Sequence, residues 1–253
     1  MQAHPMVMTG NNSMLHRCPS QDSNECYGEP TVVGLKWLLR QWPTECTVNG
    51  RSVFYDVGAG FGRLTAFMRL HTNASRVRGI EINSCRHQQS LAVRDSVRRA
   101  APSAGDLDFL LGDARKLGMA DATHAFLACQ CWSETLLVDV WRLLTQTAPH
   151  LRCVVVLSRR LPEAWSDRVG ALAASFGHVV AVNPVATTYR GASAVFFRRG
   201  ECVDPSTSTL QRATTVGKAS ASSRRCWSAA DVLAATNQQG VSMGMPLVAA
   251  RVW

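Results

Sequence analysis

Long apolar runs are missing from this sequence of 253 residues. No stretch approaches the roughly 20 consecutive apolar residues that a membrane-spanning helix needs, which argues against a helical membrane protein. The segment from Met1 to Glu25 is polar and interrupted, so it lacks the apolar core of a secretory signal. We therefore expect an intracellular protein whose 46% hydrophobic content forms a sizeable buried core.

Lysine is also scarce, because only Lys36, Lys116 and Lys218 occur among the 27 basic residues and arginine supplies the rest. With 18 acidic residues, the formal net charge is +9 at pH 7. Such a balance favours a polyanionic partner, such as nucleic acid or the surface of a nucleosome. Arginine suits bidentate contacts with phosphate, although a coding bias toward arginine and alanine explains the composition equally well. The charge therefore indicates a class of partner and leaves the fold open.

A regular cysteine framework is absent as well. The nine cysteines are scattered and odd in number, and without a secretory signal we expect reduced thiols rather than disulfides. The one close pair, Cys129 and Cys131, has no second Cys or His pair at the spacing that zinc requires. We therefore expect no metal site.

A glycine-rich stretch is the most informative feature that the sequence does contain. Val53 to Val57 is apolar or aromatic and β-prone. Three alternate glycines from Gly58 to Gly62 end this strand, and a helical pattern follows from Arg63 to Leu70. Strand, glycine turn and helix begin a nucleotide-binding βαβ unit, in which glycine lets the backbone approach a ligand. Asp56, two residues before the first glycine, would repel a pyrophosphate and suits a cationic ligand, although a glycine turn without a ligand is the alternative.

Acidic residues follow the next two predicted strands. Glu81 ends the strand Val77–Glu81, about 20 residues past the glycines, where an acid can accept from both hydroxyls of a ribose. Asp113 follows a third strand that begins at Leu107, and an ordinary turn aspartate is the alternative there. Because the carboxyl ends of parallel strands share one edge of a sheet, we expect these acids to converge with Gln130 on one ligand site.

Strand-like and helix-like segments alternate along the chain. Beyond those already given, we predict strands at 122–128, 151–157, 178–184 and 192–198, and helices at 31–42, 85–99, 134–147 and 161–176. Alternation predicts an α/β fold: a Rossmann-like, seven-stranded sheet with helices on both faces, ending in an antiparallel pair of strands. We expect a flexible leader at 1–24, one folded domain at 25–200 and a mostly disordered Ser/Thr/Arg-rich tail at 201–253.

The pattern Asp-x-Gly-x-Gly-x-Gly at 56–62 looks like the first motif of class I S-adenosylmethionine-dependent methyltransferases. Tyr27-Gly28-Glu29, one helix ahead of that turn, adds a resemblance to the disruptor-of-telomeric-silencing family. These are histone H3 lysine methyltransferases without a SET domain, and the short trypanosomatid members look most similar. The resemblance runs from about Glu25 to Arg199. It implies the seven-stranded class I sheet, S-adenosylmethionine as cofactor, nucleosomal histone H3 as partner and a nuclear location.

The resemblance also implies residue roles, carried over position by position. A Tyr-Gly-Glu loop would close over the methionine end of the cofactor, Glu81 would bind the ribose, and Asp113 with Ala114 would hold the adenine. The implied cofactor contacts are Tyr27, Gly28, Glu29, Pro30, Phe54, Asp56, Gly58, Ala59, Gly60, Gly62, Arg63, Glu81, Asp113 and Ala114. The implied catalytic residues are Tyr27, Glu29, Gln130 and Trp132.

The sequence departs from the family pattern at three places. Pro30 stands where the family usually has Thr, Ala114 replaces an aromatic residue, and Cys129-Gln-Cys-Trp132 replaces an Asn-Asn-Phe stretch. Gln130 can still offer an amide to the cofactor or the incoming amine. Trp132 either walls a lysine channel or is an ordinary core aromatic. The expected chemistry is an in-line attack of a neutral lysine amine on the sulfonium methyl, in which alignment alone contributes about 7–11 kcal/mol.

Two alternatives to a histone enzyme fit the same residues. One is an RNA or small-molecule methyltransferase on this fold, which the basic charge fits equally well. The other is a non-catalytic chromatin- or RNA-binding relative whose cofactor site has decayed around Ala128 to Trp132. In the chromatin-related cases, we expect the arginine-rich surface to contact DNA phosphates.

Overall fold

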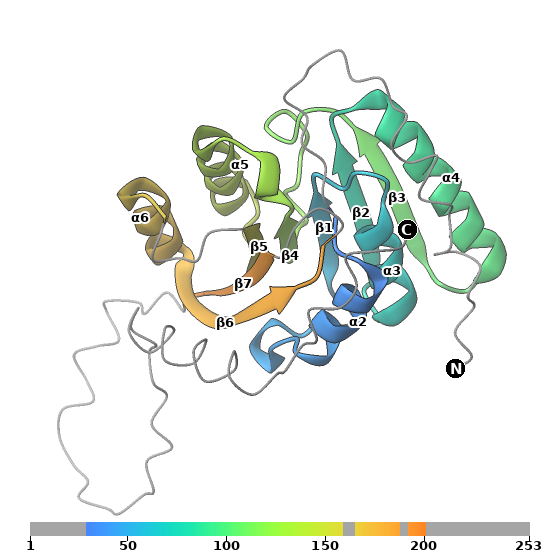
Figure 1. The fold of residues 1–253 in the computed structure, drawn as a ribbon, viewed down its shortest axis with the longest axis horizontal. Coiled ribbons are helices and arrows are strands. Elements are labelled where there is room, and N and C mark those ends of the chain that lie inside the picture. The colour runs from blue at the N-terminus through green and yellow to red at the C-terminus, as the bar shows by residue number, and fades with distance from the viewer. Residues whose placement is uncertain (1–28, 159–164, 188–191, 201–253) are drawn as a thin grey trace, which may run out of the picture. The chain divides into compact units, whose positions relative to one another are not determined.

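The computed structural model describes residues 29–158, 165–187 and 192–200 (Figure 1). Its centre is one seven-stranded sheet in the order β3-β2-β1-β4-β5-β7-β6. The strands are β1 (Val53–Val57), β2 (Arg76–Glu81), β3 (Asp106–Leu111), β4 (His124–Leu127), β5 (Cys153–Ser158), β6 (Gly177–Val185) and β7 (Ala192–Arg199). The predicted leader at 1–24 and tail at 201–253 lie outside the described residues, so both stay predictions.

Helices cover both faces of this sheet. They are α2 (Val32–Arg40), α3 (Arg63–His71), α4 (Ser84–Ala100), α5 (Glu134–Thr147) and α6 (Asp167–Phe176), with short 3-10 turns η2 (Thr44–Cys46) and η3 (Cys129–Cys131). One face packs against α2, α3 and α4, and the other packs against α5 and α6. None of the helices described here is long and apolar enough to cross a membrane.

Alternation along β1 explains how one strand serves both layers. Successive strand side chains point to opposite faces, so Phe54 joins the cluster under α3 while Tyr55 and Val57 join the cluster under α5. Among the parallel strands β1 to β5, the central strands β1, β4 and β5 are largely buried on both faces, whereas β2 and β3 carry charged side chains on one face: Arg76, Arg78, Asp106 and Asp108. Because strands β1 to β5 are parallel, their carboxyl ends meet at one edge of the sheet.

The strand order confirms the predicted fold class. Strands β1 to β5 pair in parallel, while β7 pairs antiparallel with both β5 and β6. A parallel sheet of this order, closed by an antiparallel strand and covered by helices on both faces, is the Rossmann-like sheet of class I methyltransferases. The helix predicted at 134–147 is present as α5, and Ser133 caps it, because its Oγ accepts a hydrogen bond from Leu136 N at 3.2 Å.

The first described helix begins later than its sequence suggests. We predicted a helix at 31–42, but Thr31 is the N-cap of α2 and its hydroxyl accepts from Gly34 N at 3.0 Å. Pro30 forms an isolated antiparallel bridge with Thr187. Because Thr31 is the better cap, the helix starts at Val32 and the preceding residues run along the end of β6.

The expectation of reduced cysteines is wrong for part of the described chain. Cys46 on η2 is joined by a disulfide to Cys153 on β5, and both side chains are fully buried. Cys85 is disulfide-bonded too. The sequence did not reveal the Cys46–Cys153 disulfide, because the two cysteines are 107 residues apart and meet only through the tertiary fold.

Candidate functional site

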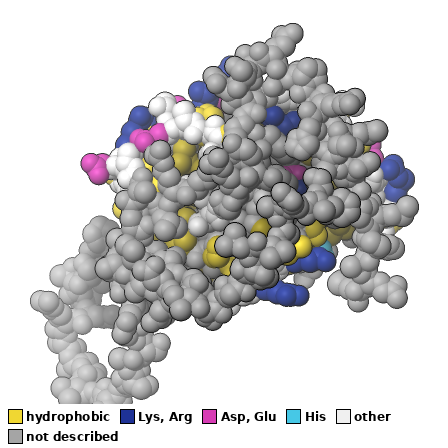
Figure 2. Space-filling view, viewed as in Figure 1, with side chains coloured by type: hydrophobic (Ala, Val, Ile, Leu, Met, Phe, Trp, Pro, Cys, Tyr) yellow, Lys and Arg dark blue, Asp and Glu magenta, His cyan; other side chains and the backbone are white. Residues whose placement is uncertain are grey.

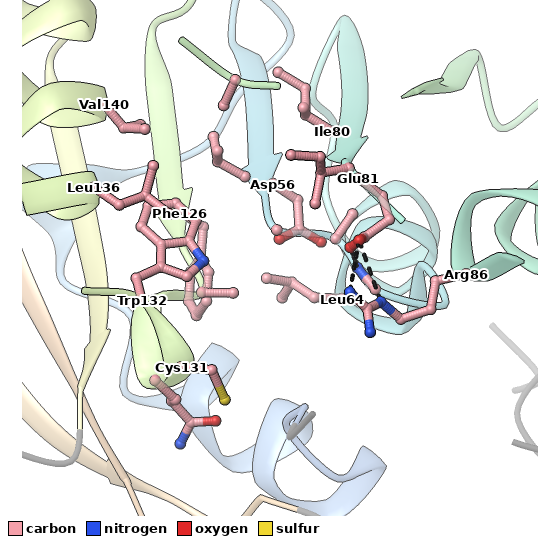
Figure 3. A pocket seen from close by; sticks show the side chains of 18 of the residues that line it. Asp56, Leu64, Ile80, Glu81, Arg86, Phe126, Cys131, Trp132, Leu136 and Val140 are labelled. Atoms are coloured by element: carbon pink, nitrogen blue, oxygen red, sulfur yellow. Dashed lines mark hydrogen bonds and ion pairs between the residues drawn. The ribbon is translucent and has the colours of Figure 1, made fainter. Parts of the chain in front are cut away.

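A cavity of about 290 Å³ opens at the carboxyl ends of β1, β2, β3 and β4 (Figure 3). Its wall combines the glycine turn, four carboxylates and an apolar side. The lining residues are Glu29, Pro30, Asp56, Val57, Gly58, Ala59, Gly60, Leu64, Ile80, Glu81, Ile82, Arg86, Gly112, Asp113, Ala114, Arg115, Phe126, Ala128, Gln130, Cys131, Trp132, Leu136 and Val140. The sequence motifs therefore converge on one hollow, as the parallel topology requires.

The glycine turn adopts a backbone that other residues rarely adopt. Gly58, Gly60 and Gly62 have φ values of 83°, 57° and 84°. A Cβ on Gly58 would lie 3.3 Å from the ring of Trp132, so a side chain there would narrow the cavity. Gly62 is the N-cap of α3 and packs against Phe109, which makes it a structural glycine.

Glu81 holds the turn and the next helix together. Its Oε2 accepts from Gly60 N at 2.8 Å, and its Oε1 accepts from Asn83 N at 2.8 Å. The same Oε1 lies 3.1 Å from Nη2 of Arg86 on α4. Only 4% of Glu81 is exposed, so these charge-assisted bonds fix the carboxylate at the cavity wall.

Two further carboxylates of the wall also pair with arginines. Glu29 Oε1 lies 2.9 Å from Nη2 of Arg63, the first residue of α3. Asp113 Oδ2 lies 2.6 Å from Nη2 of Arg115, and this guanidinium holds the pKa of the aspartate below its usual range. Both pairs place a negative and a positive group side by side at the rim, an arrangement suited to a zwitterionic ligand.

Asp56 is the most buried acid of the cavity, with 1% of its surface exposed. It lies at the end of β1 and its Oδ2 accepts from the Thr65 hydroxyl of α3 at 2.6 Å. Burial raises the pKa of Asp56 to about 7, the Thr65 bond opposes the rise, and the charges of Glu29 and Glu81 add to it. This carboxyl therefore exchanges its proton near neutral pH.

The opposite side of the cavity is apolar. Trp132 and Leu136 lie across the hollow from Asp56, while Glu81 and its arginine lie beyond Asp56 (Figure 3). Phe126 adds to the apolar lining beside Asp56, because the two residues are register partners on β4 and β1. On η3, Gln130 carries a buried Oε1 without a hydrogen-bond partner among the described residues. A buried acceptor of this kind costs free energy until a donor satisfies it, so the site favours a ligand with an N–H or O–H group. The apolar side chains next to Gln130 suit a ligand group that has lost its hydration shell.

Most of the predicted site residues line the cavity, but several do not. Tyr27 and Gly28 lie outside the described residues. Phe54, Gly62 and Arg63 are predicted cofactor contacts that are absent from the lining. Phe54 shares a face with Asp56 but lies three residues before the end of β1, and it is fully buried in the core. Arg63 turns toward Glu29 and reaches the cavity only through that carboxylate.

Sequence reasoning missed other residues of the wall. Arg86 lies in the first turn of α4, and its guanidinium contacts Glu81 at the end of β2, five positions earlier in the chain. Ile82 directly follows the same acid, is 63% exposed and lines the cavity. Leu136 and Val140 reach the cavity from α5, and no local signal distinguishes them from ordinary core residues.

The predicted arginine-rich surface is largely paired within the fold along α4. Arg94 contacts Asp95 and Asp108, and Arg98 donates to the Leu107 carbonyl at 3.1 Å. Where described residues are visible in Figure 2, Lys and Arg side chains form separate groups rather than one patch. Among the described residues, no group of three His, Cys, Asp or Glu side chains could hold a metal ion.

The sheet order, glycine turn and strand-end acids together define the class I methyltransferase fold. No protein-family model matches the sequence, and no curated protein matches it. Among solved structures, the chain is similar to magnesium protoporphyrin IX methyltransferase from Synechocystis PCC 6803 with bound SAM, at 12% identity over 66% of this chain and 76% of that one, with a TM-score of 0.49. An uncharacterized protein from Listeria monocytogenes serotype 4b has 9% identity over 66% and 67%, with a TM-score of 0.50.

A further similar structure is an RNA methyltransferase from Salinibacter ruber in complex with S-adenosyl-L-homocysteine. It has 18% identity, covers 68% of this chain and 94% of its own, and has a TM-score of 0.46. At identities this low, the likenesses concern the fold alone. Function must therefore be argued from the cavity and its residues.

Proposed function

We propose that this protein is an S-adenosylmethionine-dependent methyltransferase. The observation that carries the proposal is the convergence of a glycine turn with Asp56, Glu81 and Asp113 at one cavity of about 290 Å³. A turn of positive-φ glycines leaves room for a nucleoside. Oε1 of Glu81 is taken by Asn83 N and Arg86, but Oε2, which accepts from Gly60 N, keeps a lone pair for a ribose hydroxyl. The residues present fit this cofactor.

Each part of the cavity has a role in holding such a cofactor. Glu81 would bind the ribose, Asp113 the adenine amino group, and the Glu29–Arg63 pair the amino-acid end. S-adenosylmethionine supplies a methyl group activated by a positive sulfur. The protein supplies alignment and exclusion of water, since Phe126 lies beside Asp56 and Trp132 closes the opposite side.

The acceptor that we propose is a lysine in the core domain of histone H3, presented in a nucleosome in the nucleus. Two observations support this choice beyond the Tyr-Gly-Glu resemblance. Glu29, the last residue of that motif, is 7% exposed, and it lines the cavity together with Pro30. The apolar side chains of Trp132 and Leu136 would disfavour a charged amine by desolvation, which leaves the lysine in its nucleophilic neutral form.

A side-by-side transfer assay tests both levels of the proposal. The full chain is incubated with methyl-labelled S-adenosylmethionine and, in parallel, with nucleosomes, free histones, total RNA and small amines. We expect label on histone H3 in nucleosomes. Label on RNA alone would exclude the histone acceptor and leave the methyltransferase intact, whereas no label anywhere, together with no calorimetric binding of the cofactor, would overturn the whole proposal.

Matched variants make the assay specific to the cavity. Glu81→Ala removes the acceptor of Gly60 N and leaves Arg86 without its carboxylate, so we expect cofactor affinity to fall at least tenfold. Gly170→Ala is the control, because a Cβ there meets nothing within 4 Å in α6. Equal cofactor binding by both variants would remove Glu81 from the site.

A further inference from the structure

The charges of the cavity are balanced at three of its four carboxylates. Glu29, Glu81 and Asp113 each lie within 3.1 Å of an arginine guanidinium. Across the described residues, Asp56 forms no ion pair with Lys, Arg or His, and its side chain accepts a hydrogen bond from the neutral Thr65 hydroxyl. The most buried acid of the wall is therefore the one that lacks a counter-charge from the protein.

This lack is costly, because an ionised carboxylate that is 1% exposed loses nearly all of its hydration. The other ionisable groups around the cavity do not offset it. Glu29 in the segment before α2 and Glu81 at the end of β2 both repel the ionised form of Asp56. The guanidinium groups of Arg63 and Arg86 are already held by those two acids. A cation delivered by a ligand would supply what the protein omits.

The position of Asp56 narrows the choice of ligand cation, on the basis of the function proposed above. Asp56 lines the same cavity as Glu29 and Glu81, and the charges of both residues raise the pKa of its carboxyl. Those residues are the proposed sites for the amino-acid end and for the ribose of the cofactor. In S-adenosylmethionine the sulfonium is the atom that joins these two parts, so a molecule that spans both sites carries its positive sulfur past Asp56.

We propose that Asp56 is the counter-charge for the sulfonium, and that the protein distinguishes the charged methyl donor from its neutral thioether product at this carboxylate. Donor binding favours ionised Asp56, and the proton leaves to solvent. On transfer, the sulfur–methyl bond breaks and a bond from the acceptor nitrogen to the methyl forms. The sulfur keeps the bonding electron pair and becomes neutral, while the nitrogen takes the positive charge. Asp56 then regains a proton from solvent. The neutral product therefore lacks the charge pairing with Asp56 that stabilises the bound donor.

The free protein has the property that this mechanism needs. The pKa of Asp56 is about 7, so both protonation states are populated in the physiological range. If the donor binds only the ionised form, its dissociation constant should fall on the order of tenfold between pH 6 and pH 7.5, by proton linkage. The product carries no charge on sulfur, so its affinity should change little over the same range.

Calorimetry on the full chain tests this inference directly. S-adenosylmethionine and S-adenosylhomocysteine are titrated at pH 6, 6.75 and 7.5, each in two buffers with different ionisation enthalpies, so that the protons released per ligand are measured. We expect proton release with the donor and none from this group with the product. Asp56→Asn should abolish both the release and the pH dependence of donor affinity, because the amide does not titrate.

Two variants keep the test discriminating. Asp113→Asn is the matched control: Arg115 keeps the pKa of Asp113 low, so this change should weaken binding without altering proton release. Thr65→Val removes the bond that favours ionised Asp56, so it should shift the pH dependence to higher pH. Equal proton release with donor and product, or release that persists in Asp56→Asn, would overturn the inference while the cofactor assignment stands. Failure of both ligands to bind would overturn both.

Discussion

Replacement of Asp56 by Asn should stabilise the free protein above neutral pH. The pKa of this carboxyl is about 7 in the fold against an ordinary 3.8, raised chiefly by burial. The fold thus binds the proton more tightly than the unfolded chain does. The stabilisation from protonated Asp56 is fully present below pH 3.8 and is lost as the pH rises through 7. The difference between the unfolded and folded pKa values of Asp56 corresponds to about 4 kcal/mol.

Denaturant unfolding of the free protein measures this effect. Wild type and Asp56→Asn are compared at several pH values from 4 to 8.5 without ligand. Relative to the variant, the wild-type free energy of unfolding should fall by about 4 kcal/mol between pH 4 and pH 8. A difference between the two proteins that stays constant with pH would refute the reasoning, because it would mean that Asp56 ionises in the fold as easily as in the unfolded chain.

Three other changes test the packing around the site. Gly62→Ala should lower the free energy of unfolding by about 3 kcal/mol in denaturant titrations, because φ is 84° and a Cβ would lie 2.6 Å from Cε1 of Phe109. Gly170→Ala should raise it by about 0.5–1 kcal/mol by the same measurement, since this open position in α6 gains helix propensity. Replacing Cys46 and Cys153 together by Ser should cost about 4–5 kcal/mol more under non-reducing conditions than under reduction, given their separation of 107 residues.

Local patterns were sufficient to predict the sheet and most of its helices. The β-prone run before the glycines, the helix after Ser133 and the final antiparallel pair all depend on nearby residues, and each is present. Boundaries failed where two local signals compete: Pro30 is a good first helical residue, but Thr31 is the better cap. The disulfide could not be predicted, because it depends on η2 folding back onto β5.

The candidate site shows the same division. Glycines and acids at strand ends were predictable, because parallel topology brings the strand ends together whatever lies between them. Phe54 was misplaced because a motif match does not say how far a residue lies from the strand end. The pairing of acids with arginines was not predictable either. Arg63, Arg86 and Arg115 reach their partners through side-chain directions that only the folded backbone sets.

The contact between α2 and the end of β6 has a practical consequence for recombining this domain with relatives. Thr31 N donates to the Ala186 carbonyl at 2.9 Å, and Gly34 lets that carbonyl approach where any side chain would clash. The stretch that carries Glu29 is thereby anchored to a segment about 155 residues further along the chain. A chimera that exchanges only one of these two segments would lose the contact that positions Glu29 at the cavity rim. Both segments must therefore be exchanged together.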